Sequence, residues 1–289
     1  MADYGRFGSF NNGMRNAYEI YIPNMGTATV VDASVINTMA YALLSDGRLY
    51  TWGNNPNGNL GLGDLNPRYL PTLSRTGVAK VFKHHSQEQR SFDYVRMFIQ
   101  DTGGKVWCTG YNGQGQLGIN SGVGLSSWTE VTAAGLNPKS VWVMGSYIGF
   151  TLIQKADGNC IIAGYGRGGG GLGVSSGTGD IQSFVNANIW IGNDITYTIK
   201  QVEAGFGYYD SGGANDRINM TVLSDNGTSS RLLSCGDNSW GTIGNGTTTG
   251  NNILTPTAPI GLTARIKKIV KMGNTPGTIH ALDYDGNLW

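Results

Sequence analysis

Charged side chains are scarce in this sequence. Asp, Glu, Lys and Arg make up 13% of the 289 residues, about half the usual share, and the formal net charge is +1. No basic field is therefore available to attract nucleic acid or an anionic membrane surface. We also find no apolar run long enough to span a bilayer and no signal peptide. The sequence thus predicts neither a nucleic-acid partner nor membrane insertion.

Cysteine and proline are also few, and helical periodicity is absent. Cys108, Cys160 and Cys235 are an odd number without Cys-x-x-Cys spacing, so we expect neither a disulfide framework nor a zinc site. We predict that they are small buried residues of strands. Only 8 prolines are present, and the 46 glycines are interleaved with apolar residues, so we expect a folded chain.

A strand–turn–strand pattern recurs along the chain. Its clearest copy is YALLSDGRLYTWGNNPNGNLGLG at residues 41–63, in which Asp46-Gly47 separates two apolar runs. This dipeptide between apolar runs is the strongest short-range signal of a β-hairpin. The matching turn glycines are Gly47, Gly104, Gly158, Gly227 and Gly286. Pairs of glycines five residues apart follow the first four hairpins: Gly53/Gly58, Gly110/Gly115, Gly164/Gly169 and Gly236/Gly241.

These repeats predict an all-β fold. Dense glycines break a strand and let backbones approach closely, and the leucines after them would plug a neighbouring apolar layer. A hairpin cannot bury its own apolar face, so it needs copies beside it. A proline followed by a further apolar strand precedes four of the five hairpins, at Pro23, Pro71, Pro138 and Pro259, so the chain divides into about five four-stranded units. We predict one domain over residues 1–289, with repeats at 38–94, 95–148, 149–217 and 218–278, and residues 1–37 plus 279–289 forming a fifth.

The motif at residues 42–63, and next best that at 106–118, resembles the regulator of chromosome condensation repeat family. The resemblance covers essentially the whole chain, strongly in two repeats and loosely in the others, and it implies a β-propeller. Proteins of this family typically have seven blades. Here we count about five, closed into a ring by pairing of the N- and C-terminal strands in one blade, which would remove exposed sheet edges. Known members include an exchange factor for a small GTPase, β-lactamase inhibitors, ubiquitin-ligase modules and surface proteins, so the fold alone does not select a function.

No set of residues indicates catalysis, a cofactor or a metal. The adjacent His84 and His85, near Glu88 and Asp93, lack metal-ligand spacing. The glycine run at residues 168–171 continues into Leu172-Gly173 in repeat register, which favours a corner between strands over a phosphate loop. Aspartates at the hairpin turns, such as Asp46, Asp157 and Asp285, fit a turn requirement. We therefore expect a protein that is not an enzyme.

Two long linkers supply the candidate binding residues. They run over residues 83–94 and 206–217, and insertions in repeat folds map to loops on one face, which is often the binding face. Loop tyrosines offer rigid, amphipathic contact area. The predicted partner-binding residues are His84, His85, Arg90, Tyr94, Tyr208, Tyr209 and Asp210.

Two functional interpretations remain open. Low charge, abundant Gly, Asn, Ser and Thr, and few lysines are typical of virion surface and tail-fibre proteins. The first interpretation is therefore a virion or bacterial cell-surface protein, located on a particle or outside the cell, that binds a protein or glycan receptor and other virion proteins. The alternative is a regulator that binds an enzyme or a small GTPase, as an inhibitor or exchange factor.

Overall fold

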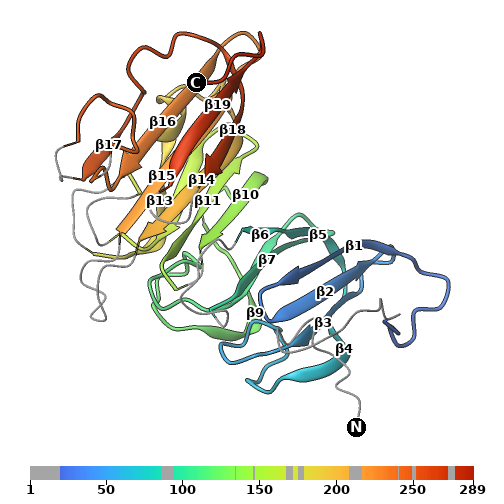
Figure 1. The fold of residues 1–289 in the computed structure, drawn as a ribbon. Coiled ribbons are helices and arrows are strands. Elements are labelled where there is room, and N and C mark those ends of the chain that lie inside the picture. Colours follow the sequence, from blue (N-terminus) through green and yellow to red (C-terminus); the bar gives the residue numbers. More distant parts are fainter. Residues whose placement is uncertain are drawn as a thin grey trace, which may run out of the picture.

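The computed structural model describes residues 20–85, 94–133, 135–145, 147–166, 172–174, 179–207, 217–239, 241–248, 252–272 and 277–289. In this part of the chain the strands form five sheets (Figure 1). The first contains β1 (Val30–Ile36), β2 (Met39–Leu44), β3 (Leu49–Gly53) and β4 (Arg68–Arg75). The second contains β5 (Val78–Phe82), β7 (Arg96–Asp101), β8 (Val106–Gly110) and β9 (Leu125–Glu130).

The remaining sheets repeat this antiparallel order. The third contains β10 (Pro138–Gly145), β11 (Gly149–Lys155), β12 (Cys160–Gly164) and β13 (Ile181–Asn186), with the short β6 (His84–His85) added to β10. The fourth contains β14 (Thr198–Gly207), β15 (Arg217–Asp225), β16 (Ser230–Gly236) and β17 (Ile253–Thr257). The fifth contains β18 (Ile266–Met272) and β19 (Thr278–Asp283). The all-β prediction is confirmed.

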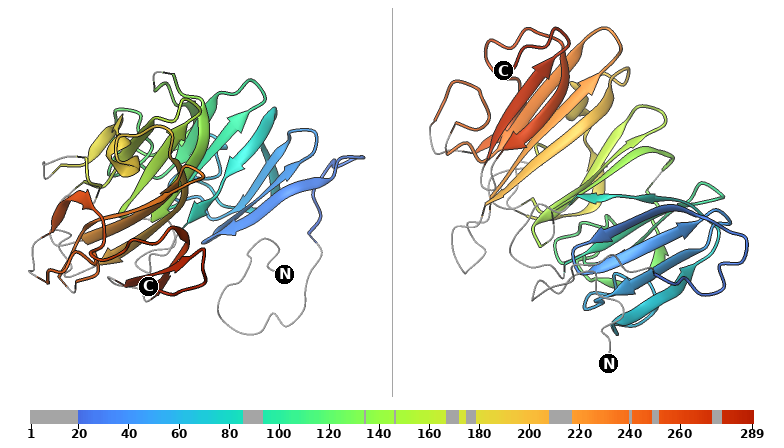
Figure 2. Two further views of the ribbon diagram at one scale, coloured as in Figure 1. Left: turned by 90° about the horizontal axis from the view of Figure 1, so that it is seen from above. Right: turned by 45° about the vertical axis from the view of Figure 1, so that its right-hand side comes forward.

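The sheets stand side by side as the blades of a propeller. Figure 2 shows them fanned along an arc, with the first sheet at one end and the β18–β19 hairpin at the other. First strands of neighbouring sheets contact one another, as in β10 with β14 and β14 with β18. The predicted closure of the ring involves residues 1–19, which lie outside the described residues, so it stays a prediction.

The predicted hairpins are all present, and their turns need glycine. Gly47, Gly158 and Gly227 have φ of 83°, 89° and 97°, a left-handed conformation that side chains disfavour. Asp46 Oδ1 accepts the backbone N–H of Arg48, and Asp157 Oδ1 accepts that of Asn159. The structure thus gives these aspartates the turn role predicted for them.

The glycine-rich corners join one sheet to the next. We call the segments that begin at Gly53, Gly110, Gly164 and Gly236 and end at Gly63, Gly118, Gly173 and Gly244 the corners. A Cβ on Gly58 would overlap the backbone of Ser126 on β9, and one on Gly115 would overlap that of Gln182 on β13. The plug side chains Leu60, Leu117, Leu172 and Ile243 are all buried. Close approach and plugging, both predicted from the sequence, are confirmed.

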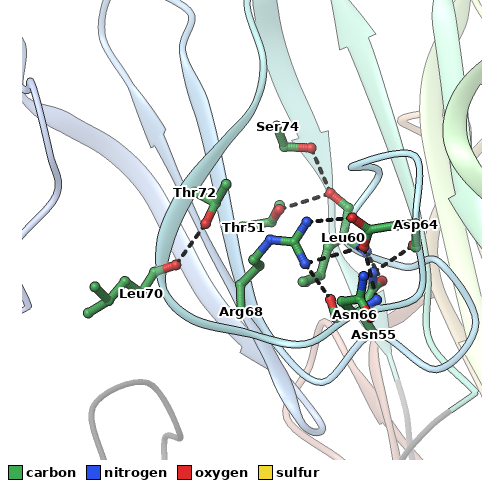
Figure 3. Close-up of polar contacts among 9 residues, drawn as sticks. All are labelled: Thr51, Asn55, Leu60, Asp64, Asn66, Arg68, Leu70, Thr72 and Ser74. Carbon is green, nitrogen blue, oxygen red and sulfur yellow. Dashed lines mark hydrogen bonds and ion pairs between the residues drawn. The ribbon is translucent and has the colours of Figure 1, made fainter.

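An asparagine organises three of the four corners from within, whereas the third has Gly166 at this position. Figure 3 shows the first corner. In the first corner, Asn55 accepts the N–H of Leu60 at 2.9 Å and donates to the Asp64 carbonyl at 2.8 Å. The Leu60 carbonyl accepts the hydroxyls of Thr51 and Ser74. Asn112 and Asn238 bind the plug residues Leu117 and Ile243 in the same way. This explains why asparagine follows the first corner glycine by two positions.

The outer strand of the first sheet differs from its counterparts. Arg68 of β4 pairs with Gly53 as Leu125 of β9 pairs with Gly110, so Tyr69 and Leu70 are the equivalents of the residues that receive a corner on β9. Both are exposed, at 55% and 63% of their surface, and Leu70 points away from the polar cluster in Figure 3. No corner among the described residues covers them.

One local prediction is wrong. His84 and His85 are predicted to lie in a loop, but they form β6, whose backbone pairs in parallel with Val143 and Met144 of β10. This pairing partner is distant in the sequence. A 3-10 helix, η1 (Asn188–Ile191), follows β13 and ends at Gly192 with φ of 65°.

The three cysteines are buried, as predicted. Burial raises the pKa of the Cys108 and Cys160 thiols to about 12, and it raises the pKa of Cys235 as well. No helix in the described residues has the length and apolar character needed to cross a membrane.

Asp283 provides a test of the last hairpin at low pH. The Trp289 indole and the Asn287 amide donate to it, each at 2.9 Å, and they lower its pKa to about 2. Because this pKa is below the unfolded value of about 4, the stabilisation is complete above that value and is lost as the pH falls to about 2. The Trp289 indole resonance should therefore titrate with a midpoint about 2 in NMR spectra.

The Asp283→Asn variant is the control for this titration. Its Trp289 indole resonance should show no such transition, because the carboxyl group is absent. A wild-type midpoint near 4 would contradict the hydrogen bonds on which the prediction rests.

Candidate functional site

The corners lie on one side of the arc, together with the turns that join the first and second strands of each sheet. In each four-stranded sheet, the residue after the first corner glycine donates its backbone N–H to the residue at the start of the second strand. The pairs are Asn54 with Thr38, Tyr111 with Val95, Tyr165 with Gly149, and Asp237 with Ile218. Corners and these turns therefore emerge together, and we call this side the corner face.

Three tyrosines cluster on the corner face. Tyr94 leads into β7, Tyr111 follows β8, and Tyr147 lies in the β10–β11 turn, so two sheets contribute. The ring centroid of Tyr94 lies 4.6 Å from that of Tyr111 and 5.0 Å from that of Tyr147, and the last two are 6.0 Å apart. Such tilted contacts favour packing beyond area burial. All three rings are half-buried, and together they form a rigid aromatic surface.

Hydrogen bonds from the polar side chains of Gln116 and Arg96 hold the backbone around Tyr147 in place. Gln116 donates to the Tyr147 carbonyl at 2.9 Å and to Gln114 at 2.7 Å. The buried Arg96 donates to the carbonyls of Met144 and Phe150, which flank the turn that carries Tyr147. Burial raises the pKa of Tyr111, so its phenol stays neutral at physiological pH. The cluster is therefore an uncharged contact surface.

A hollow of about 400 Å³ opens beside Tyr111, between the first and second corners. From the first corner side it is lined by Pro56, Asn57 and Leu65. From the second side it is lined by Tyr111, Ser126 and the glycines at 113, 122 and 124. Its volume falls in the range of small ligand sites, about 300–1,000 Å³.

Of the residues predicted to bind a partner, the structure describes three: Tyr94, His84 and His85. Tyr94 belongs to the cluster. His84 lies in β6, and its Nε2 is 2.7 Å from the Gly145 carbonyl, so it helps to hold β6 against β10 within the third sheet. The backbone of His85 pairs with Met144. Arg90, Tyr208, Tyr209 and Asp210 lie outside the described residues.

The segment that holds Tyr208, Tyr209 and Asp210 is attached at the corner face. Its described flanks, Gly207 and Arg217, are paired at the end of the β14–β15 hairpin. This is the end at which the fourth corner begins, since Asp237 bonds to Ile218. The described residues that flank these two linkers therefore lie on the corner face.

Sequence reasoning missed Tyr111 and Tyr147. Tyr111 occupies a corner position that holds Asn54, Tyr165 and Asp237 in the other repeats, so nothing in the repeat marks it as a binding residue. Tyr147 comes from another sheet, and its proximity follows only from how the sheets pack. Within the described residues, no three His, Cys, Asp or Glu side chains gather as a metal site requires.

Comparison with known proteins agrees with this geometry. Residues 46–84, which span the first hairpin turn, the first corner and β5, match the model of the regulator of chromosome condensation (RCC1) repeat. The mouse protein described as probable E3 ubiquitin-protein ligase HERC4 is 25% identical over 194 residues, which are 60% of this chain and 17% of that protein. The rat protein of the same description matches equally.

Solved structures share the fold. Yeast RCC1 bound to Kap60 superimposes with a TM-score of 0.59 at 16% identity, over 91% of this chain and 56% of that one. Prp20p from Saccharomyces cerevisiae gives 0.57 at 16% identity, over 90% and 57%. Human WBSCR16 gives 0.57 at 14% identity, over 84% and 56%.

Residues 46–84 therefore match a repeat of the RCC1 type, and the chain shares the β-propeller blade architecture of the RCC1 structures. It spans slightly more than half the length of the solved relatives and about a sixth of the length of the HERC4 proteins.

Proposed function

We propose that this protein is a non-enzymatic recognition module, a regulator that binds another protein through its corner face. The observation that carries the proposal is the cluster of Tyr94, Tyr111 and Tyr147, which presents three uncharged aromatic rings fixed from below. Interfaces concentrate their binding energy in such rigid, half-buried aromatic residues. A regulator of an enzyme or a small GTPase is the class of partner-binding protein that we favour.

The comparisons support a protein partner. One of the similar structures is a complex of yeast RCC1 with Kap60, and another was solved together with a study of the binding of Prp20p to Gsp1p and histones. Those interactions belong to those proteins. The similar proteins give no support to a virion protein or to a glycan receptor, so the composition remains the sole basis of that interpretation.

The Tyr147→Ala variant tests the proposal. A partner is first captured from lysate by cross-linking and then purified. Its dissociation constant for the wild-type protein should be at least ~30-fold lower than for Tyr147→Ala, because a central aromatic residue contributes about 2 kcal/mol or more. Binding is measured by biolayer interferometry, and circular dichroism verifies that the variant is folded.

Tyr69→Ala is the matched control. Tyr69 is an exposed tyrosine of β4 and lies outside the cluster, so its removal should leave the affinity within about twofold. Equal affinities for wild type, Tyr147→Ala and Tyr69→Ala would refute recognition through the cluster.

A further inference from the structure

The hollow beside Tyr111 has walls of two different kinds. On one side, Pro56 and the 58% exposed Leu65 form an apolar wall. On the other, Gly113 of the second corner and Gly122 and Gly124, which lie between this corner and β9, leave the backbone without side-chain cover. No charged side chain lines the hollow. An occupant must therefore combine uncharged side chains with groups that hydrogen-bond to peptide backbone or to hydroxyl and amide side chains.

Tyr111 lines the hollow and also belongs to the tyrosine cluster, and its neighbours fix its ring. Tyr94 and Tyr147 pack against Tyr111. A Cβ added to Gly113 would collide with the Tyr111 hydroxyl, so this glycine leaves the space that the phenol occupies. Because the ring is already fixed, a ligand that contacts it does not have to immobilise it first.

We propose that the hollow binds a short extended, uncharged segment of a partner protein that carries proline or leucine side chains. Such a segment has little conformational entropy to lose when it is rich in proline. Its apolar side chains can contact the Tyr111 ring and the wall of Pro56 and Leu65. The inference rests on the proposed function, because the hollow is continuous with the tyrosine cluster through Tyr111.

The lining favours a peptide over a sugar. A sugar presents many hydroxyl groups, each of which needs a partner when it is buried. Besides the uncovered backbone, the hollow offers three polar side chains, those of Asn57, Ser126 and Tyr111, and its other lining residues are Pro56, Leu65 and the three glycines. A proline- or leucine-containing segment has fewer groups to satisfy.

An NMR titration of the isotope-labelled protein tests the inference. The probe is the capped tetrapeptide acetyl-Pro-Pro-Leu-Pro-amide, and the readout is the set of amide resonances of Gly113, Gly122 and Gly124. We expect saturable shifts with a dissociation constant of about 1 mM, the affinity of a small isolated ligand. Methyl β-glucoside and a capped tetra-aspartate should cause no shifts at these glycines.

Two variants and one control sharpen the test. Gly113→Ala should displace the Tyr111 ring and weaken tetrapeptide binding at least tenfold, and Leu65→Asp should weaken it by placing a charge on the exposed apolar wall. Gly179→Ala should leave binding unchanged, because a Cβ there meets no atom within 4 Å.

The inference is overturned if the tetrapeptide leaves the three glycine resonances unchanged, if the glucoside shifts them instead, or if both variants bind like wild type. The outcome of the tetrapeptide titration can be distinguished from that of the partner-binding measurement. Loss of partner binding in Tyr147→Ala with an inert hollow would reject the hollow and keep the proposed function. Tetrapeptide binding without an effect of Tyr147→Ala would reject the proposed function.

Discussion

Replacing Gly58 by alanine should destabilise the protein by about 4 kcal/mol or more, which is in the range of the most damaging single substitutions. Gly58 has φ of 76°, and a Cβ there would lie within 2.5 Å of the Leu125 carbonyl oxygen and overlap the Ser126 backbone. Neither neighbour is the free end of a flexible side chain. The first corner would therefore have to move away from β9, and this movement would separate the first two sheets. Urea denaturation measures the loss.

Gly261→Ala is the matched control for this prediction. Gly261 has nearly the same φ, 79°, but a Cβ there meets no atom within 4 Å. Alanine at that position should lower the free energy of unfolding only by the cost of its left-handed backbone conformation, about 1–2 kcal/mol. Equal losses in the two variants would show that backbone conformation alone, and not contact between sheets, makes Gly58 necessary.

Replacing Gln154 by leucine should cost about 3 kcal/mol. Gln154 is fully buried on β11, donates to the carbonyls of Gly158 and Tyr197 at 3.1 and 2.7 Å, and accepts the N–H of Ile199 at 2.9 Å. Leucine would leave the backbone groups of Tyr197 and Ile199 buried without these partners, each at about 1–3 kcal/mol. The contact between the third and fourth sheets depends on them. Urea denaturation again measures the loss.

The same position in the preceding repeat supplies the control. Gln100 of β7 is half-exposed, and it donates to the carbonyl of Gly104 within its own hairpin at 3.1 Å. Gln100→Leu should change the free energy of unfolding by less than about 1 kcal/mol. If both glutamine variants lose the same stability, the bridge between sheets made by Gln154 is not what stabilises the fold.

Local sequence signals predicted much of the fold. Asp46-Gly47 defines a hairpin because the two residues suffice for the turn. The five-residue spacing of Gly53 and Gly58 recurs at Gly110 and Gly115 because both corners must approach the next sheet closely. Asn55 shows the limit of such reading. Its place in the motif was visible, but its role in binding Leu60 became clear only from the structure.

The candidate site was less predictable, because it depends on neighbouring sheets. Tyr94 was chosen as a loop tyrosine, yet its partners Tyr111 and Tyr147 come from a corner and from another sheet. Likewise, His84 was assigned to a loop because its parallel partner in β10 is distant in the sequence. A repeat motif describes each sheet well and says little about which exposed side chains meet across two of them.

Amide hydrogen exchange of the protein, free and bound to its purified partner, tests recognition through the corner face most directly. We predict slower exchange in the complex at Tyr94, at residues 111–124 and at Tyr147 with the turn that follows it. The hairpin turns on the opposite side, at residues 45–48, 102–105 and 156–159, should exchange at unchanged rates. Protection confined to those opposite turns, with none at the tyrosine cluster, would contradict the account.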